Sequence, residues 1–172
     1  LKKFKPIELP YIFKLTSNDK NTDNVINNLN KYDSQSNDTL FLKDKEVNGV
    51  YCFGYLADTS KFYSLIYFYP ADSYCPVLAT YTKEGNLINQ CRLIANGSSE
   101  DCGLKYYSIN CIVNKDYSIF CSDTVIWDYF CNENGPIPNT AETWIYFKKG
   151  KVFEDGKISL DKTQKLTSKL NP

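Results

Sequence analysis

Residues 61–94 read KFYSLIYFYPADSYCPVLATYTKEGNLINQCRLI, and this stretch decides the fold. Within it, residues 62–69 are aromatic or aliphatic on both alternating faces, apart from Ser64. A strand with one solvent-exposed face would alternate with polar residues, so this segment is predicted to be a strand buried on both sides. Pro70 cannot donate a ladder hydrogen bond and ends the strand.

A β-hairpin is predicted directly afterwards. Its strands are residues 77–83 and 86–94, and Glu84-Gly85 is the turn, because glycine adopts positive φ without strain. On the return strand one alternating face leaves Arg92 outside and is therefore predicted to point into the core. That face consists of Leu87, Asn89, Cys91 and Leu93.

Hairpin signals continue along the chain. Residues 47–57 are a predicted strand with bulges or close approaches at Gly49 and Gly54. Residues 104–113 and 117–127 form a predicted hairpin, as do 143–147 and 151–153 around Lys149-Gly150, before a last strand at 157–160. The chain is thus predicted to be mainly β: an antiparallel meander forming a barrel or two packed sheets.

One domain is expected over residues 1–172, with a β-meander core at 46–160. The peripheral segment 1–45 holds a predicted edge strand at 7–15, restricted by Pro6 and Pro10, and one short helix. The helix is predicted because Val25, Leu29 and Tyr32 would lie on one of its faces, and Thr22 or Asp23 could cap its N-terminus. Residues 161–172 are expected to be a loose polar tail.

Three segments, VLATYTKEGNLINQCRLI, YSINCIVNKDYSIFCSD and WIYFKKGKVFEDGKI, follow a common pattern of strand, Lys/Gly turn and aliphatic return strand. In this the chain resembles secreted or lipid-anchored β-meander proteins of Bacteroidetes-type bacteria, over residues 50–160. The resemblance implies an envelope location and no particular activity, and it supplies no functional residues.

Composition restricts the partners. The chain has 172 residues with a formal net charge of zero, so it lacks the basic excess typical of nucleic-acid binding. It contains no apolar run long enough to cross a bilayer and no signal peptide. Because it starts at Leu1 and has no Met, we expect a processed or trimmed product, with room for a lipid anchor upstream.

Seven cysteines favour an oxidising, extracytoplasmic compartment: secreted, periplasmic or cell-surface. No CxxC spacing and no His occur, so no metal site is expected, and an odd number leaves at least one thiol unpaired. The disulfide candidates are Cys102, Cys131, Cys75 and Cys121, with the loop cysteines Cys102 and Cys131 preferred. Cys91 and Cys111 could equally serve as small apolar core residues.

The sequence shows no catalytic signature and implies no cofactor. Without His, Ser-His-Asp and Cys-His arrangements are excluded, and no nucleotide-binding glycine motif is present. Carboxylates at Asp123, Asp128 and Glu133 leave open a glycosidase-type pair.

A ligand surface, if there is one, is predicted in the long segment between the two tryptophans. Its residues would be Trp127, Asp128, Tyr129, Glu133 and Trp144. The segment is rich in Pro and Gly and too long for a tight hairpin, and loops of this length are often functional. The alternative is a lid whose aromatic side chains cap the sheet.

The leading hypothesis is an extracytoplasmic binding module for a protein or carbohydrate ligand. The alternatives are a carbohydrate-active enzyme with paired carboxylates, and a structural or immunity-type component that binds another protein.

Overall fold

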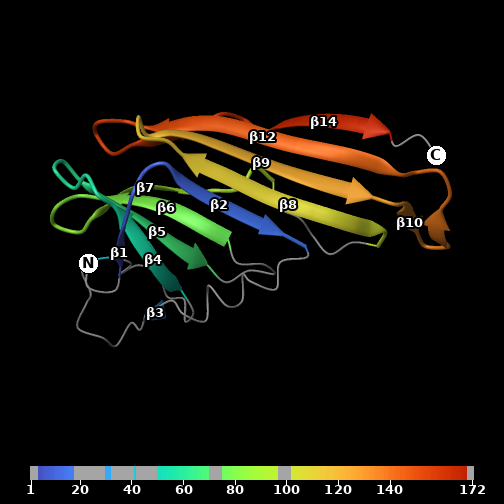
Figure 1. The fold of residues 1–172 in the computed structure, drawn as a ribbon, viewed down its shortest axis with the longest axis horizontal. Helices are drawn as coiled ribbons and strands as arrows, with labels where there is room; N and C mark the ends of the chain where they lie inside the picture. The colour runs from blue at the N-terminus through green and yellow to red at the C-terminus, as the bar shows by residue number, and fades with distance from the viewer. Residues whose placement is uncertain are drawn as a thin grey trace.

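The computed structural model describes residues 4–17, 30–31, 41, 50–69, 75–96 and 102–169. In these residues all regular structure is β, arranged as two packed sheets and a small separate hairpin (Figure 1). The sheets do not close into a barrel, so of the two predicted architectures the packed sheets are correct. The described part of the chain contains no helix long and apolar enough to cross a bilayer.

The first sheet has the order β1-β4-β5-β6-β7, with β3 also paired to β4. Its strands are β1 (Lys5–Ile7), β3 (Asn30–Lys31), β4 (Tyr51–Leu56), β5 (Tyr63–Tyr69), β6 (Cys75–Tyr81) and β7 (Leu87–Arg92). From β4 to β7 each strand pairs antiparallel with the next, as the consecutive hairpin signals predicted.

The second sheet has the order β13-β12-β9-β8-β2, with β14 also paired to β12. Its strands are β2 (Tyr11–Thr16), β8 (Leu104–Val113), β9 (Ser118–Trp127), β12 (Glu142–Val152), β13 (Ile158–Leu160) and β14 (Gln164–Lys169). The predicted hairpin of residues 104–113 and 117–127 is confirmed as β8 and β9. The small hairpin consists of β10 (Phe130–Asn132) and β11 (Gly135–Ile137).

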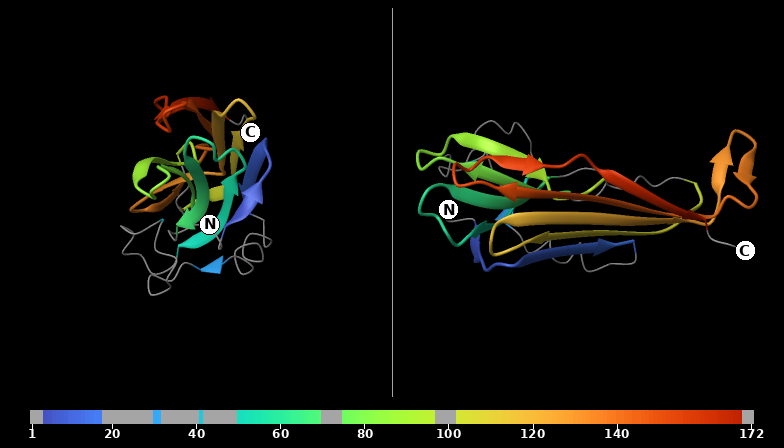
Figure 2. Two further views of the ribbon diagram at one scale, coloured as in Figure 1. Left: turned by 90° about the vertical axis from the view of Figure 1, so that its left-hand side faces the viewer. Right: turned by 90° about the horizontal axis from the view of Figure 1, so that it is seen from above.

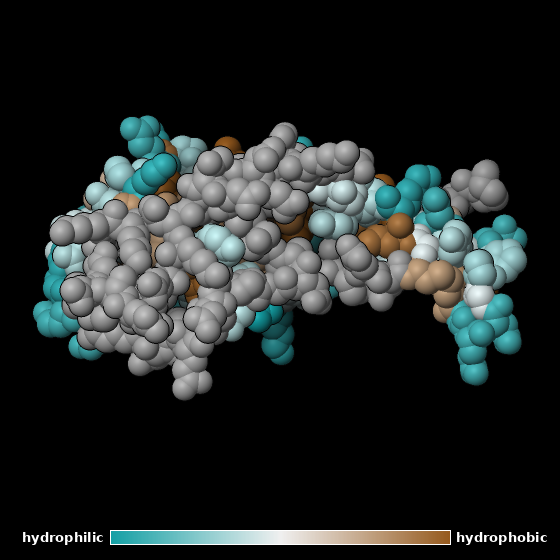
Figure 3. Space-filling model, turned by 90° about the horizontal axis from the view of Figure 1, so that it is seen from below, coloured by the Kyte–Doolittle hydropathy of each residue, from teal (hydrophilic) through white to brown (hydrophobic). Residues whose placement is uncertain are grey.

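The second sheet is longer than the first and extends past it (Figures 1 and 2). The β10–β11 hairpin stands at the extended end, where hydrophobic surface gives way to hydrophilic surface at the tip (Figure 3). The β4–β5, β6–β7, β8–β9 and β12–β13 connections gather at the opposite end, which we call the turn end (Figure 1).

The main core lies between the two sheets. Leu56, Ile66 and Leu78 of the first sheet pack with residues such as Ile109 and Val113 of the second. The opposite face of β5 enters a second cluster, with Leu65 and Tyr67 packed beside Phe4 and Phe41. The prediction that this strand is buried on both faces is therefore confirmed, and the reason is that it separates two apolar cores.

The β6–β7 hairpin is confirmed, with Gly85 at φ 85° in its turn. One detail of its predicted core face is wrong. Cys91 and Leu93 do pack in the main core, but Leu87 is 40% exposed. The pairing register shifts near the turn, because Thr80 faces Asn89 whereas Tyr81 faces Leu87. The skipped residue, Ile88, moves Leu87 onto the other face of the sheet.

The predicted N-terminal strand over residues 7–15 is wrong in its extent. The chain forms two edge strands, β1 and β2, and turns between the sheets at the cis Leu9-Pro10 peptide. β1 runs parallel to β4 and places Lys5 opposite Gly54. A Cβ on Gly54 would collide with Ile7 and lie 2.6 Å from the Lys5 carbonyl oxygen, so the predicted close approach at Gly54 is confirmed.

Two predictions near the C-terminus are wrong. Residues 143–147 and 151–153 do not pair around Lys149-Gly150, because β12 runs straight through both positions. After β12 the chain turns at Asp155-Gly156 and returns as β13. The tail is not loose over 164–169, where β14 pairs along six residues of β12.

The predicted helix over 22–32 lies outside the described residues except at Asn30 and Lys31, which form β3. Gly49 also lies outside them.

Candidate functional site

The two tryptophans predicted to flank a ligand surface pack against each other. The ring centroid of Trp127 lies 5.3 Å from that of Trp144 and 5.6 Å from that of Phe130. Trp127 is only 7% exposed, so it caps the inner face of the second sheet. The Lys165 ammonium lies 3.3 Å from the Trp144 centroid, a cation–π contact that covers this ring. This geometry favours the lid interpretation for Trp127.

The other predicted site residues lie around this cluster in separate settings. The Lys105 ammonium donates to the Asp128 carboxylate at 2.9 Å in an ion pair, and Glu133 lies in the exposed two-residue turn between β10 and β11. Tyr129 is 37% exposed beside Gly103. The long segment thus contains a tight hairpin, contrary to the expectation from its Pro and Gly content.

Two of the disulfide candidates are joined. Cys102, before β8, bonds to Cys131 of β10 and ties the small hairpin to the second sheet. Cys75 and Cys121 are buried thiols instead. Asp123, one of the considered carboxylates, is buried and accepts a 2.5 Å hydrogen bond from the Asn96 backbone N–H.

The turn end contains a pocket of about 470 Å³, which we call the end pocket. Three connections form it: the β4–β5 loop, the β8–β9 turn, and the end of β12 with the turn that follows. Its lining residues are Asp58, Ser60, Lys61, Phe62, Asp116, Tyr117, Lys151, Val152, Phe153 and Glu154. The volume is within the range of small-molecule sites, about 300–1,000 Å³.

Two walls of the end pocket are shaped by the same local motif. Asp58 accepts hydrogen bonds from the backbone N–H (2.9 Å) and hydroxyl (2.7 Å) of Ser60. Asp116 does the same with Ser118, at 3.1 and 2.7 Å. An Asp that bonds its own chain two residues on fixes a turn without help from tertiary packing.

Tyr117 holds a conformation unusual for its size. Its φ is 62°, in the left-handed region that bulky side chains rarely adopt. The backbone is held there by two hydrogen bonds: its N–H donates to Asn114 (2.9 Å), and its carbonyl accepts from Val152 (3.0 Å). Strain of this kind, on the order of 1–3 kcal/mol, concentrates at binding and catalytic sites.

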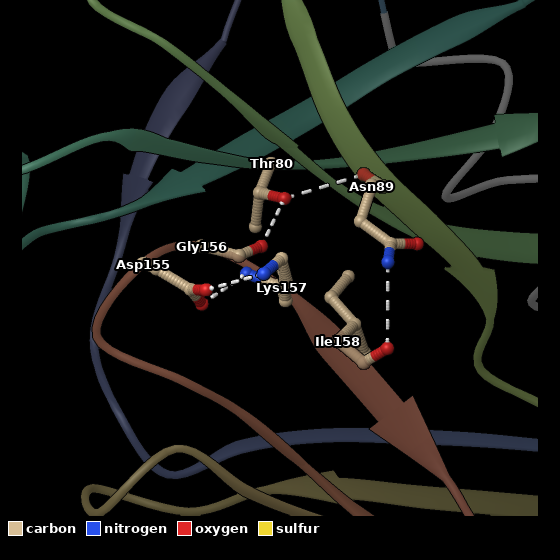
Figure 4. A network of polar contacts seen from close by, with 6 residues as sticks. All are labelled: Thr80, Asn89, Asp155, Gly156, Lys157 and Ile158. Carbon is tan, nitrogen blue, oxygen red and sulfur yellow. Dashed lines mark hydrogen bonds and ion pairs between the residues drawn. The ribbon is translucent and has the colours of Figure 1, made fainter.

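The third wall is pinned to the first sheet. The Thr80 hydroxyl donates to the Gly156 carbonyl at 2.6 Å, and the Asn89 amide donates to the Ile158 carbonyl at 3.5 Å (Figure 4). Within the turn, Asp155 accepts from the Lys157 N–H at 3.0 Å. The bonds from Thr80 and Asn89 join β6 and β7 to Gly156 and Ile158, at the C-terminal side of the turn that carries Phe153.

Phe153 stands between two hollows. It and Glu154 line the end pocket and also a neighbouring hollow of about 560 Å³, which continues toward Asn89 and Ser159. Phe153 is 49% exposed although it lies in a concave region. An elongated ligand could therefore contact the ring while it occupies both hollows.

The charges of the end pocket are three carboxylates and two ammonium groups. The Ser60 N–H and hydroxyl lower the pKa of Asp58, and the Ser118 hydroxyl and N–H lower the pKa of Asp116. Lys61, at 2.7 Å, lowers the pKa of Glu154. All three carboxylates are therefore ionised at neutral pH and act as hydrogen-bond acceptors.

Burial, and then the Asp58 charge, raise the pKa of Tyr117. Its hydroxyl is therefore neutral at physiological pH and can donate a hydrogen bond. Among the described residues no group of three or more Cys, Asp or Glu side chains is arranged to hold a metal ion. The end pocket thus offers aromatic faces, hydrogen-bond acceptors and ammonium donors, which are the groups that contact a small polar ligand.

The end pocket has no signature in the sequence. Asp58–Ser60 and Asp116–Ser118 share the pattern Asp-x-Ser, which by itself indicates only a turn. The pattern would have indicated a site only if the turns had been known to meet at one end of the molecule.

Comparison of the chain with protein-family models, with curated proteins and with solved structures finds no match. What the fold and site define is a two-sheet β protein with a ligand-sized pocket at its turn end.

Proposed function

We propose that the protein is an extracytoplasmic binding module whose end pocket holds a carbohydrate. The observation that carries the proposal is Phe153, a half-exposed aromatic ring between two adjoining hollows. Covering an apolar ring that is partly exposed to water is favourable, so a ligand that packs on the ring is stabilised.

Carbohydrates fit this chemistry because they combine an apolar ring face with many hydroxyl groups. The ring face would stack on Phe153, and hydroxyls would donate to Asp58, Asp116 and Glu154, whose ionised oxygens accept strong hydrogen bonds. Lys151 would donate to hydroxyl or ring oxygens from the same wall. The pinned turn and the two Asp-x-Ser turns make these groups rigid, which reduces the entropy lost on binding.

Binding is better supported than hydrolysis. Glycoside cleavage needs one carboxyl group that is protonated near neutral pH, which requires a raised pKa. The carboxylates of the end pocket all have lowered pKa values, because each accepts hydrogen bonds as an anion. The disulfide between Cys102 and Cys131 supports an oxidising compartment outside the cytoplasm.

An array of immobilised glycans tests the proposal with the wild-type protein and two variants. Phe153→Ala removes the proposed stacking ring, and we expect it to weaken binding about tenfold, ~1.4 kcal/mol. Tyr129→Ala is the matched control, because Tyr129 is another exposed aromatic side chain that lies at the opposite end. Failure of the wild type to bind any glycan, or equal binding by Phe153→Ala, would contradict the proposal.

A further inference from the structure

Cys111 and Cys121 face each other across the β8–β9 hairpin. They are direct partners in the antiparallel register, and both side chains are completely buried in the main core. Their sulfur atoms are 2.9 Å apart, less than 1 Å longer than the bonded distance of 2.04 Å between Cys102 and Cys131.

The backbone geometry also suits a bond. Directly opposed residues of an antiparallel pair have Cα atoms about 4.5–5.5 Å apart, inside the range of about 4.4–6.8 Å seen for disulfides. A small rotation of the two side chains therefore suffices, and the strands need not move.

We propose that Cys111 and Cys121 form a second disulfide in the compartment where the Cys102–Cys131 bond forms. The oxidant is a disulfide-bearing molecule, either oxidised glutathione or a thiol–disulfide oxidoreductase. The two S–H bonds of Cys111 and Cys121 break and one Sγ–Sγ bond forms. The disulfide of the oxidant breaks, takes up the two electrons and the two protons, and leaves as two thiols.

The bond forms while the chain folds. Thiolate is the attacking species in disulfide exchange, and in the folded protein the hydrogen bond shared with Cys121 and burial raise the pKa of Cys111. The hairpin brings the two cysteines together over ten residues of sequence, whereas Cys102 and Cys131 are separated by 29. The shorter loop closes first, before the first sheet covers the pair.

Two other thiols compete for the same partners. Cys91 packs against the main core, and Cys75 is buried at the start of β6 in the first sheet. Burial raises the pKa of Cys91 to about 12, and Cys91 lies on β7 of the other sheet. Because these partners meet Cys121 only after the sheets pack, the hairpin pairing forms in preference to them.

A non-reducing peptide map of the full-length chain tests the inference. The reduced, unfolded protein is refolded in a buffer of reduced and oxidised glutathione, then unfolded without reductant and alkylated. Of the seven cysteines, two disulfides leave three to be alkylated and one disulfide leaves five. Cleavage after Lys and Arg separates residues 84–92, 93–105, 106–115 and 116–148, which contain Cys91, Cys102, Cys111 and Cys121 with Cys131, respectively.

We expect three alkylated cysteines and one species in which peptides 93–105, 106–115 and 116–148 are linked. In Cys121→Ser, peptide 106–115 should be released while 93–105 stays attached; in Cys131→Ser the reverse should hold. Cys91→Ser is the control and should leave all three peptides linked. Five alkylated cysteines in the wild type, or peptide 106–115 linked to 84–92, would overturn the inference, and the wild-type result stands whether or not the variants fold.

Discussion

Replacement of Trp127 tests the interpretation that the aromatic cluster is structural. Trp127→Ala removes a side chain that is 7% exposed, together with its ring contacts to Trp144 and Phe130. Truncation of a buried Trp to Ala lowers the free energy of unfolding by about 3–5 kcal/mol, because a cavity replaces the ring. We expect a loss near the middle of this range, ~4 kcal/mol. Each aromatic contact contributes about 0.5–1.5 kcal/mol beyond the stabilisation that comes from buried apolar area.

Trp127→Phe separates packing from hydrogen bonding. The Trp127 indole N–H is buried and has no acceptor among the described residues. An unpaired buried donor destabilises a protein by about 1–3 kcal/mol, so its removal offsets much of the packing lost with the smaller ring. We therefore expect Trp127→Phe to remain within about 1 kcal/mol of the wild type.

Urea unfolding followed by circular dichroism measures both changes, with the denaturant slope as a check on two-state behaviour. Tyr129→Ala is the control at a nearby aromatic residue that is 37% exposed, and it should change stability by less than about 1 kcal/mol. A loss below about 1 kcal/mol for Trp127→Ala would refute the structural role. Equal losses for the Phe and Ala variants would refute the argument about the unpaired indole.

Three further changes have defined outcomes. Gly150→Ala should cost about 1–3 kcal/mol in urea unfolding and displace β13, because the added methyl group collides with that strand. Cys102→Ser should cost about 3–4 kcal/mol, since the bond to Cys131 closes a loop with a sequence separation of 29. Burial raises the pKa of Cys91 from 9.0 to about 12 and that of Tyr67 above 10.0, so both stay neutral in the folded state. Their contribution to the free energy of unfolding is complete below pH 9. It is lost as the pH rises toward 12, by up to about 1.4 kcal/mol per group and pH unit, because only the unfolded state loses the proton. A free energy of unfolding that stays constant between pH 9 and 12 would contradict this prediction.

The strands around residues 61–94 were predictable because their signals are local. The apolar faces of β5 and the glycine turn at Gly85 need no knowledge of distant residues. Exposure of Leu87 was not predictable, because a bulge changes the phase of alternation without a marker in the sequence.

The C-terminal strands, in contrast, could not be predicted from local signals. Lys149-Gly150 has the composition of a turn, yet β9 pairs with β12 on both sides of these positions and keeps the chain extended. Gly150 is needed for another reason, which is the close crossing of β13. β14 is exposed along its length and has no apolar periodicity, so only its backbone pairing with β12 reveals it.

The end pocket depends on topology in the same way. Its walls come from residues 58–62, 116–117 and 151–154, which meet because successive hairpins turn at one end. The sequence indicates turns but not that they meet at one end of the molecule. It favoured the two tryptophans as a ligand surface, whereas their rings pack against each other.

Amide chemical-shift mapping of the nitrogen-15-labelled protein tests the central claim most directly. The probes are glucose, galactose, mannose and N-acetylglucosamine, each titrated to about 10 mM, which suffices for dissociation constants in the millimolar range. The account predicts that at least one sugar shifts amide signals of residues 58–62, 116–117 and 151–154, and that Phe153→Ala raises the dissociation constant obtained from these shifts about tenfold. Shifts confined to residues 127–146, or no shift with any of the four sugars, would contradict it.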